Sequence, residues 1–309
     1  MAAQHAPRFE FLEAADGRST TTFTTTFTTC MEITAMKSQT SPVLIIGANG
    51  KTGGRVNALL ERQGIATRGA SRSTAPSFDW TRPEGWAAAL DGVSKAYVTY
   101  QPDLSVDGAH EAIAELSDLA RRKGLERVVL LSGRGEPGAQ RAEKALQTAG
   151  VPWTIVRASW FNQNFSEGYL LDGVLAGEIA LPAGTVPEPF IDADDIADVV
   201  VAALTHERHA NQLYEVTGPR ALTFDEAVNE IATGLGRPVR YERITSEDFV
   251  ISMRAYVPED IVQLLRELFT VVLDGRNSQV MHGVTEALGR PARDFSDYVR
   301  NTIRSGVWS

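Results

Sequence analysis

The sequence predicts an α/β fold, in which a Rossmann-type, doubly wound parallel sheet is joined to a smaller, mainly helical C-terminal subdomain. Three observations indicate this fold. Short apolar runs alternate with helical patterns from residue 42 to residue 156, which is the order expected of a parallel sheet. A glycine-rich turn joins the first apolar run to the first helix. After residue 158 the alternation gives way to helices and turns rich in glycine and proline.

Each element of the first half is predicted from its periodicity. The expected strands are 43–46, 65–70, 96–99, 127–131 and 153–156, and the expected helices are 53–63, 83–90, 109–122 and 138–149. In the helix at 109–122, Ile113, Leu116 and Leu119 recur at a spacing that places them on one face. Connections between parallel strands are right-handed, so the ligand crevice is expected at the carboxyl ends of the strands.

The second half is expected to contain more helix than strand. The expected elements are a helix with turns in 160–189, a helix in 190–204, a strand at 213–216, a helix at 223–235, a short strand at 239–243 and two or three helices in 246–304. Asp192 would be the N-cap of the helix in 190–204, with Asp195 as its partner at the third helical position. The strand at 213–216 would return to the sheet.

These elements divide the chain into three parts. Residues 1–40 are expected to form a disordered, threonine-rich extension, because the run 19–29 has low complexity and few apolar residues; alternatively, translation begins at Met31 or Met36. Residues 41–158 would form the Rossmann domain, to which 189–218 return, and residues 159–188 and 219–309 would form a substrate subdomain.

The composition argues against two classes of partner. Acidic residues outnumber basic residues by 39 to 30, which gives a net charge of −9, so no nucleic-acid partner is expected. No apolar run approaches the roughly 18 residues that a membrane-spanning helix needs, so no membrane partner is expected. The only cysteine, Cys30, fits a reducing, cytoplasmic location. The expected partner is a small-molecule substrate, and the protein is expected to be a monomer or a homodimer.

The glycine-rich turn predicts a dinucleotide site. Gly47 would permit a tight turn, Gly50 would let the backbone approach a pyrophosphate, and Gly53 would let the helix pack closely against the strand. The free N–H groups at the start of the helix would bind the phosphates. Lys51 and Thr52 follow the first glycine too closely for a P-loop, so a nucleotide triphosphatase is not expected.

The end of the second strand indicates which dinucleotide binds. NAD sites carry an acidic residue there, which binds the ribose 2′-hydroxyl, but the stretch 65–74 contains no acid. Arg72 and Ser73 stand in its place, and Arg68 precedes them. Because a guanidinium matches a 2′-phosphate in a bidentate way, NADP(H) is favoured over NAD(H). Alternatively, Arg72 is a solvated loop residue.

Other kinds of site find no support in the sequence. His206, His209 and His282 have no acidic or cysteine partners at metal-binding spacing, so no metal site is expected. His206 and His209 are expected at a solvated helix end. The chain contains no Gly-x-Ser-x-Gly motif, which leaves a hydrolase without support.

At this point the motifs become recognisable as a set. The turn at 47–53, followed by Ser71-Arg72-Ser73 and Phe78-Asp79-Trp80, resembles the NmrA-like family of atypical short-chain dehydrogenases/reductases. Three later segments resemble it as well: Pro152–Arg157, Trp160–Phe165 and Pro189–Asp198. The resemblance covers about residues 42–304. It is strongest toward the ergot-alkaloid branch, which includes festuclavine synthase and agroclavine dehydrogenase, and NAD(P)H:quinone reductases are neighbours in the same family.

The resemblance implies site residues. Asp79 would contact the adenine amino group, Ser132 would approach the nicotinamide, and Lys144 would hold the nicotinamide ribose. The full set of expected cofactor-binding residues is Gly47, Asn49, Gly50, Lys51, Thr52, Gly53, Arg72, Ser73, Asp79, Trp80, Thr99, Ser132 and Lys144. The expected substrate-binding residues are Gln101, Trp160, Phe161, Asn164 and Tyr169.

One part of the usual catalytic machinery is missing. Most short-chain dehydrogenases use a Tyr-x-x-x-Lys pair on one helix together with a serine, but Gln140 stands four residues before Lys144. The expected catalytic residues are Lys144, Ser132 and Tyr100, with Tyr169 and His110 as further candidate proton donors. Without the tyrosine, an acceptor that needs no strong proton donor is favoured.

These observations predict an NADPH-dependent oxidoreductase that transfers hydride to a quinone, an iminium or a similarly activated aromatic or polycyclic molecule. Two alternatives remain open. One is a non-catalytic, NAD(P)-sensing regulator, which would need a protein partner. The other is a non-redox tailoring enzyme that acts on a quinoid intermediate.

Overall fold

The computed structural model describes residues 41–309, which belong to one compact unit; the predicted extension at 1–40 lies outside the described residues. A six-stranded sheet with the order β2-β1-β3-β4-β5-β7 runs through this unit, and its strands pair in parallel. Its strands are β1 (Val43–Ile46), β2 (Thr67–Ala70), β3 (Lys95–Val98), β4 (Arg127–Gly133), β5 (Trp153–Ala158) and β7 (Gln212–Val216). The predicted Rossmann-type fold is therefore confirmed.

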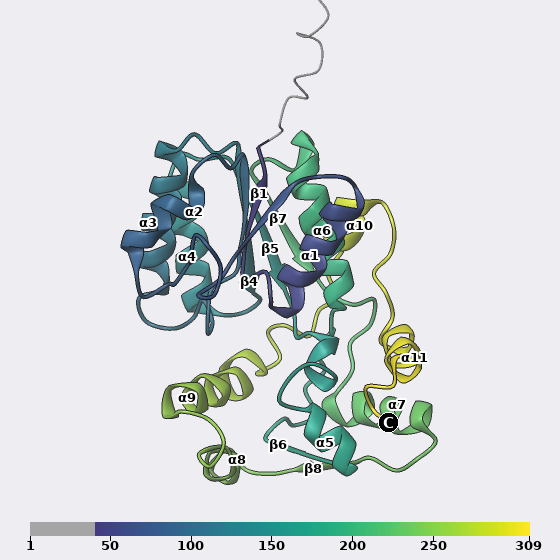
Figure 1. Ribbon diagram of the computed structural model, residues 1–309. Coiled ribbons are helices and arrows are strands. Elements are labelled where there is room, and N and C mark those ends of the chain that lie inside the picture. The colour runs from purple at the N-terminus through teal and green to yellow at the C-terminus, as the bar shows by residue number, and fades with distance from the viewer. Residues whose placement is uncertain (1–40) are drawn as a thin grey trace, which may run out of the picture. The chain divides into compact units, whose positions relative to one another are not determined.

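Helices cover both faces of this sheet (Figure 1). On one face lie α2 (Trp86–Leu90), α3 (Ala109–Arg122) and α4 (Pro137–Thr148). On the other face lie α1 (Lys51–Arg62), α6 (Ala193–Thr205) and α10 (Gly283–Leu288). Parallel sheets of this kind are buried on both sides. In β1, Leu44 joins the hydrophobic core beneath α3, whereas Ile45 joins the core beneath α6, as the alternation of side chains along a strand requires.

The order of the strands places a crevice at one edge of the sheet. The chain runs from β1 outward to β2 and then crosses to β3 on the other side of β1. At such a point, the loops after two neighbouring strands run in opposite directions and leave a crevice between them. Ligands of open α/β sheets bind in this crevice. The site is therefore expected at the carboxyl ends of β1 and β3.

A second group of elements lies at the carboxyl ends of the strands (Figure 1). It comprises α5 (Leu171–Ala176), β6 (Glu178–Leu181), α7 (Phe224–Leu235), β8 (Arg240–Arg243), α8 (Ser246–Met253), α9 (Glu259–Glu267), a π-helical turn (Leu268–Val272) and α11 (Phe295–Ser305). Its core is aromatic, with Phe165, Phe190 and Phe224 packed edge to face or tilted against one another. The predicted division into domains stays a prediction.

Several boundaries differ from the predicted ones. α1 begins at Lys51, two residues early, because Gly50 is its N-cap, and β4 and β5 extend to Gly133 and Ala158. β6 is absent from the predicted elements, since it is four residues long and pairs only with the distant β8. Beyond residue 246 the structure has four α-helices rather than two or three, and α10 packs against α6 and β7 of the sheet layer.

Two predictions about polar residues are wrong. The sequence predicts His209 at a solvated helix end, but His209 is buried, its Nδ1 lies 2.8 Å from the Tyr214 hydroxyl, and burial lowers its pKa to about 4. The sequence predicts Asp195 as a capping partner, but its buried carboxylate accepts a 2.6 Å bond from the Arg293 backbone N–H. The cap itself is confirmed, because Asp192 accepts a 2.8 Å bond from the Asp194 N–H.

Candidate functional site

The turn after β1 adopts a conformation that requires glycine. Gly47 has φ of +80°, and a Cβ at this position would overlap Thr99 Oγ1. A Cβ at Gly53 would overlap the Gly47 carbonyl oxygen. A 2.8 Å bond from the Gly50 N–H to the Gly47 carbonyl closes the turn. α1 therefore starts directly against the end of β1, which is the arrangement that the glycine spacing predicts.

The start of α1 offers backbone donors to an anion. Its N-cap, Gly50, has no side chain that could bind the first N–H groups, and the first turn contains no acidic residue. The N–H groups of a first helical turn have no partner within the helix, and the helix dipole adds partial positive charge there. We call residues 47–53 together with Arg72 the nucleotide cradle. The cradle fits a pyrophosphate at its helix end.

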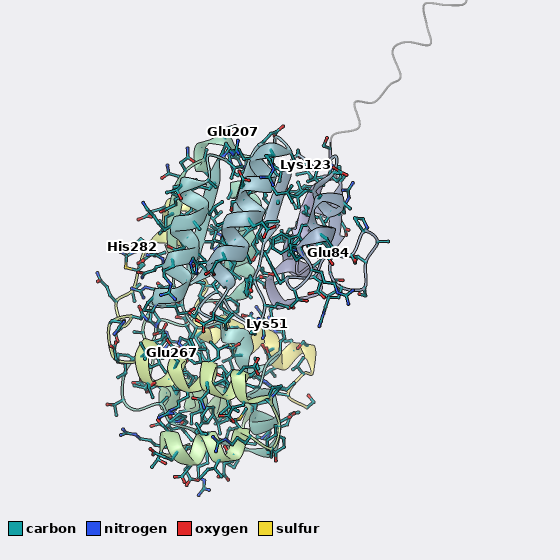
Figure 2. All side chains as sticks on the ribbon, turned by 90° about the vertical axis from the view of Figure 1, so that its left-hand side faces the viewer. Lys51, Glu84, Lys123, Glu207, Glu267 and His282 are labelled. Carbon is teal, nitrogen blue, oxygen red and sulfur yellow. The ribbon has the colours of Figure 1, made fainter. Side chains whose placement is uncertain are left out.

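The side chains of this turn point in different directions. Lys51 lines the cavity described below, and burial lowers its pKa while Glu167 opposes that effect. Thr52 is buried, and its Oγ1 accepts a 2.9 Å bond from the Tyr97 hydroxyl, which makes it a packing residue. Asn49 is exposed beside the turn. Figure 2 shows Lys51 near the boundary between the sheet layer and the helical group.

The loop after β2 leaves a guanidinium available. Arg72 and Ser73 are exposed, and Arg72 makes no hydrogen bond or ion pair within residues 41–309. Arg68, in contrast, donates to the carbonyl oxygens of Ala89 and Asp91 at 3.1 and 2.5 Å. Of these two arginines, Arg72 is therefore the one that can turn toward a 2′-phosphate.

The predicted adenine-side residues form a rigid wall beside this loop. Asp79 Oδ1 accepts bonds from the backbone N–H and the hydroxyl of Thr81 at 2.9 and 2.8 Å, and these bonds lower its pKa. Trp80 donates its indole N–H to the Thr99 carbonyl at 3.2 Å and packs on Tyr100 with ring centroids 4.6 Å apart. An indole fixed at both its edge and its face gives a flat apolar surface next to the cradle.

A cavity of about 360 Å³ continues from the cradle. Its floor comes from the ends of β3, β4 and β5, and its walls come from the start of α1, the segment 158–169, α9 and the π-helical turn. Cavities of this size hold small organic ligands. The walls are largely apolar or aromatic, and Leu265 and Leu268 close the side that faces the helical group.

The structure gathers most of the predicted site residues around this cavity. Those that line it are Lys51, Thr99, Tyr100, Ser132, Trp160, Phe161, Asn164 and Tyr169. Gln101 is exposed and does not line the cavity, because Tyr100 and Pro102 on either side of it turn inward instead. His110 also lies outside the lining, half-buried and paired with Glu111 at 2.9 Å.

Lys144 lies away from the cavity, contrary to the prediction. Both Lys144 and Gln140 are exposed on α4, whereas Ala139, Ala142 and Glu143 are buried. The positions that a Tyr-x-x-x-Lys pair would occupy therefore face solvent, and the helix presents its apolar side to the sheet. The predicted catalytic role of Lys144 lacks geometric support.

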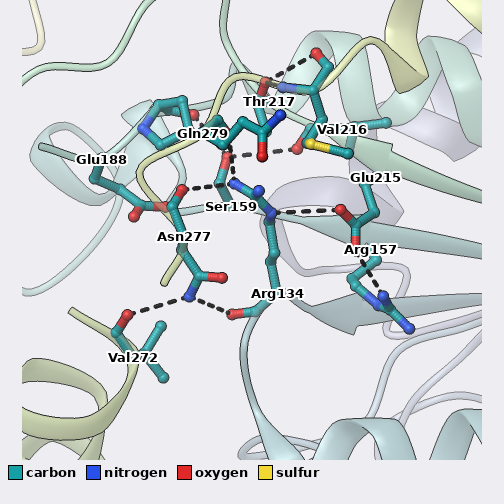
Figure 3. A network of polar contacts seen from close by, with 12 residues as sticks. Arg134, Arg157, Ser159, Glu188, Glu215, Val216, Thr217, Val272, Asn277 and Gln279 are labelled. Carbon is teal, nitrogen blue, oxygen red and sulfur yellow. Dashed lines mark hydrogen bonds and ion pairs between the residues drawn. The ribbon is translucent and has the colours of Figure 1, made fainter. Parts of the chain in front are cut away.

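Ser132 lies at the end of β4, but its proton is already engaged. Its hydroxyl donates to Glu143 Oε1 at 2.6 Å. Arg157 binds the same carboxylate, with its Nε 2.9 Å from Oε1, and donates to Glu215 at 2.6 Å. Figure 3 shows this chain of contacts reaching from Arg157 through Glu215 to Arg134. Ser132 can thus accept a hydrogen bond from a ligand, but it does not donate its own proton freely.

Arg134 connects the end of β4 to a distant loop. It donates to the carbonyls of Asn277 and Gln279 at 2.6 and 2.9 Å, while the Asn277 amide donates to the carbonyls of Arg134 and Val272 at 3.2 and 3.1 Å (Figure 3). These bonds join the segment after the π-helical turn to the floor of the cavity. Because these hydrogen bonds satisfy the Arg134 guanidinium, Arg134 can be buried, with only 7% of its surface exposed, beside an apolar cavity.

Three acidic residues in or beside the cavity are absent from the residues that the sequence predicts for the site. Glu136 and Asp103 line the cavity, and Glu188 lies buried behind Trp160, whose backbone N–H donates to it at 3.4 Å. Burial raises the pKa of Glu188 to about 8. In the sequence, Glu136 stands directly before Pro137 at the start of a helix, and only its tertiary neighbours indicate that it is buried.

Residues 41–309 lack two further kinds of feature. No group of three or more His, Cys, Asp or Glu side chains in this range could hold a metal ion. Likewise, no helix in this part of the chain is both long enough and apolar enough to cross a membrane.

Comparison with known proteins shows relatives that align with most of the chain. The model of the NmrA-like family matches residues 140–298. The chain is 30% identical over 280 residues to the NAD(P)H azoreductase of Xenophilus azovorans, covering 84% of this chain and 96% of that protein. It is 26% identical over 290 residues to festuclavine synthase II of Penicillium roqueforti (strain FM164), covering 86% and 99%.

A solved structure shares the fold. The NADPH-dependent quinone oxidoreductase of Escherichia coli, solved in complex with NADPH, matches with a TM-score of 0.71 at 18% identity and covers 84% of this chain and 99% of its own. The match extends over both the sheet layer and the helical group.

Proposed function

Because the chain belongs to the NmrA-like family, we propose that it is an NADPH-dependent oxidoreductase that transfers hydride to a quinone, an iminium or a similarly activated aromatic or polycyclic molecule. The main observation behind this proposal is that the nucleotide cradle and the cavity are continuous. The nucleotide cradle leads directly into a cavity of about 360 Å³ with aromatic walls. A bound dinucleotide would thus have its reactive end beside a small organic ligand.

The residues of the cradle fit NADP(H) in particular. The N–H groups at the start of α1 would hold the pyrophosphate, and the exposed guanidinium of Arg72 would pair with the 2′-phosphate. When bound, NADPH supplies a hydride at the nicotinamide. The ends of β4 and β5, with Ser132 and Ser159, would orient that ring from the floor of the cavity.

The walls of the cavity favour a flat, apolar acceptor. Trp160 packs against Phe224 and Phe269 with ring centroids 5.3 and 5.0 Å apart, so its position is set by the aromatic core of the helical group. Phe161 and Tyr169 complete the same side. Positioning an activated acceptor against the cofactor and excluding water would supply much of the rate enhancement.

The test is NADPH oxidation by the purified full chain against a panel of quinones, cyclic iminium salts and azo compounds. We expect turnover on at least one class, with NADPH preferred over NADH. Binding is measured separately by quenching of tryptophan fluorescence, because Trp80 lies beside the cradle. Tight NADPH binding without turnover on any acceptor would refute the oxidoreductase and favour the NAD(P)-sensing regulator with its protein partner.

The remaining predictions about context belong with this proposal. A small-molecule substrate, a monomeric or homodimeric state and a cytoplasmic location stay predictions. Light scattering during the same preparation gives the oligomeric state directly.

A further inference from the structure

Two carboxyl groups meet in the wall of the cavity. Asp103 follows β3 and Glu136 precedes α4, and both line the cavity. Ser105 joins them, because its backbone N–H donates to Asp103 Oδ1 at 2.8 Å and its hydroxyl donates to Glu136 Oε2 at 2.8 Å. Ser105 therefore bridges the two carboxyl groups through its backbone and its side chain. Nothing in the proposed function yet uses this pair.

Close packing holds the Glu136 carboxyl in one place. Its side chain folds back over the end of β4, where a Cβ at Gly133 would overlap the carboxyl group. A Cβ at Gly138 would overlap the backbone of Ser105, so the start of α4 is pressed against the segment that carries Asp103. Glu136 is only 8% exposed, and it borders the cavity. The carboxyl therefore lies beside the floor where the reacting atoms would meet.

The surroundings of Glu136 favour its protonated form. Burial raises the pKa of Glu136 well above its usual range, and the nearby Asp103 carboxyl raises it further. The charge of Glu267 on α9 also raises this pKa, and the hydrogen bond from Ser105 opposes the shift. Arg134 is turned away toward Glu215, Asn277 and Gln279. Burial and negative neighbours thus favour a protonated carboxyl at Glu136.

The other hydroxyl groups of the cavity are weaker candidates for proton transfer. Ser132 donates to Glu143. Burial, followed by the charge of Glu111, raises the pKa of Tyr100 and makes it a poorer acid. No lysine lies four residues after Tyr100 or Tyr169 on a shared helix, so the usual means of lowering a tyrosine pKa is missing in both.

We propose that Glu136, which Ser105 bridges to Asp103, is the proton donor of this site, and that the cavity therefore serves neutral acceptors such as azo compounds as well as cationic ones. The inference rests on the proposed function, because it names the second half of the same reaction. It places a general acid where the sequence shows none, since the helix tyrosine is replaced by Gln140.

The step balances as follows for an azo compound. Hydride addition brings one hydrogen and an electron pair to one nitrogen, and the N=N π pair becomes a lone pair with negative charge on the other nitrogen. The O–H bond of Glu136 breaks, its electron pair stays on the carboxylate oxygen, and the proton forms the second N–H bond. The products are a hydrazine and NADP⁺, and half-buried Asp103 returns a proton from solvent. A cationic iminium becomes a neutral amine on hydride addition and needs no proton.

The experiment compares these two acceptors in one enzyme. Glu136→Gln keeps the shape of the side chain and an acceptor for the Ser105 hydroxyl, but it has no acidic proton. We expect its turnover of a neutral azo dye to fall about 100-fold or more, while its turnover of an N-alkyl iminium salt stays within about threefold. In deuterated water, the wild-type enzyme should slow on the azo dye and not on the iminium salt.

The controls separate the possible failures. Glu247→Gln removes an exposed carboxylate on α8, outside the cavity lining, and should leave the ratio of the two activities unchanged. An equal loss on both acceptors, or no loss on either, in Glu136→Gln would overturn the proposal. If the wild-type enzyme reduces neither acceptor nor any other member of the panel, the proposed function itself fails, and the donor role fails with it.

A second readout does not depend on activity. Infrared spectra of the cofactor-free protein at neutral pH should show protonated carboxyl groups from both Glu136 and Glu188. Glu136→Gln should remove one band, and Glu188→Gln, the matched control, should remove the other. Asp103→Asn should shift the titration of the Glu136 band to lower pH, because a negative neighbour is gone. A Glu136 band that is absent at neutral pH in the wild-type protein would overturn the donor role of Glu136.

Discussion

The nucleotide cradle takes nearly all of its groups from one short segment, whereas the cavity takes its wall from segments spread between Lys51 and Val272. In the cradle, what matters is the backbone: the left-handed Gly47, the close approach at Gly53 and the free N–H groups of α1. In the cavity, what matters is side chains that meet only after folding, such as Glu136 and Asp103.

The cradle and the cavity therefore tolerate amino-acid substitutions differently. A backbone turn in contact with other backbone atoms has no flexible side chain that could move aside for an added methyl group. A cavity wall made of side chains can adjust its shape, but its buried charges depend on partners from other elements.

Gly53→Ala should cause the largest loss. Its Cβ would overlap the Gly47 carbonyl oxygen and push α1 away from β1. We expect a loss of stability of about 3 kcal/mol and a loss of NADPH affinity of about 100-fold or more, measured by chemical unfolding and fluorescence titration. The matched control is Gly54→Ala, whose Cβ would lie 3.4 Å from the Ala48 carbonyl oxygen, an ordinary contact. Equal effects of the two changes would show that close approach at Gly53 is unimportant.

Glu188→Gln should flatten the pH dependence of stability. Glu188 is 1% exposed, and its folded pKa of about 8 lies above the ordinary value of 4.5. Between these values the folded chain holds a proton that the unfolded chain has released, so wild-type stability falls as pH rises from about 4.5 to 8. The difference between the two ends should be on the order of a few kcal/mol. Urea unfolding of both proteins at pH 5 and pH 9 measures it, and parallel curves would contradict the prediction.

Arg72→Ala should change cofactor choice rather than stability. Removing the guanidinium should weaken NADPH binding by about 10- to 100-fold, since hydrogen bonds to charged groups contribute about 1.5–3 kcal/mol, and should leave NADH binding nearly unchanged. Arg68→Ala is the control, because Arg68 binds backbone carbonyls of Ala89 and Asp91 and should affect stability alone. Equal weakening of NADPH and NADH by Arg72→Ala would refute the 2′-phosphate contact.

Lys144→Ala should have the smallest effect. Its side chain is exposed on α4 and does not line the cavity, so we expect stability within about 0.5 kcal/mol of the wild-type value and turnover within about twofold. Steady-state kinetics with the best acceptor of the panel measure this directly. A large fall in turnover would restore Lys144 to the catalytic role that the family resemblance implies.

The cradle could be predicted in detail because its evidence is local. The strand at 43–46, the glycine spacing and the absence of an acid in 65–74 are all contained in about 30 residues of sequence. The exposed position of Lys144 on α4 also follows from local sequence. Ala139, Ala142 and Leu146 mark the buried side of α4, and Lys144 lies about 200° around the helix from Ala142.

The parallel sheet, the dinucleotide turn and the family can all be predicted from the sequence alone. Each depends on spacings within a strand, a turn or a helix, and such spacings follow from the fixed geometry of the backbone. Which charged side chains are buried, and which residues they contact, depends on the tertiary structure. Glu136 and Asp103 are 33 positions apart, and they meet because β3 and β4 are neighbours in the sheet and end at the same edge. A side chain's acidity depends on the atoms around it in space, so their pairing appears only once the chain is folded.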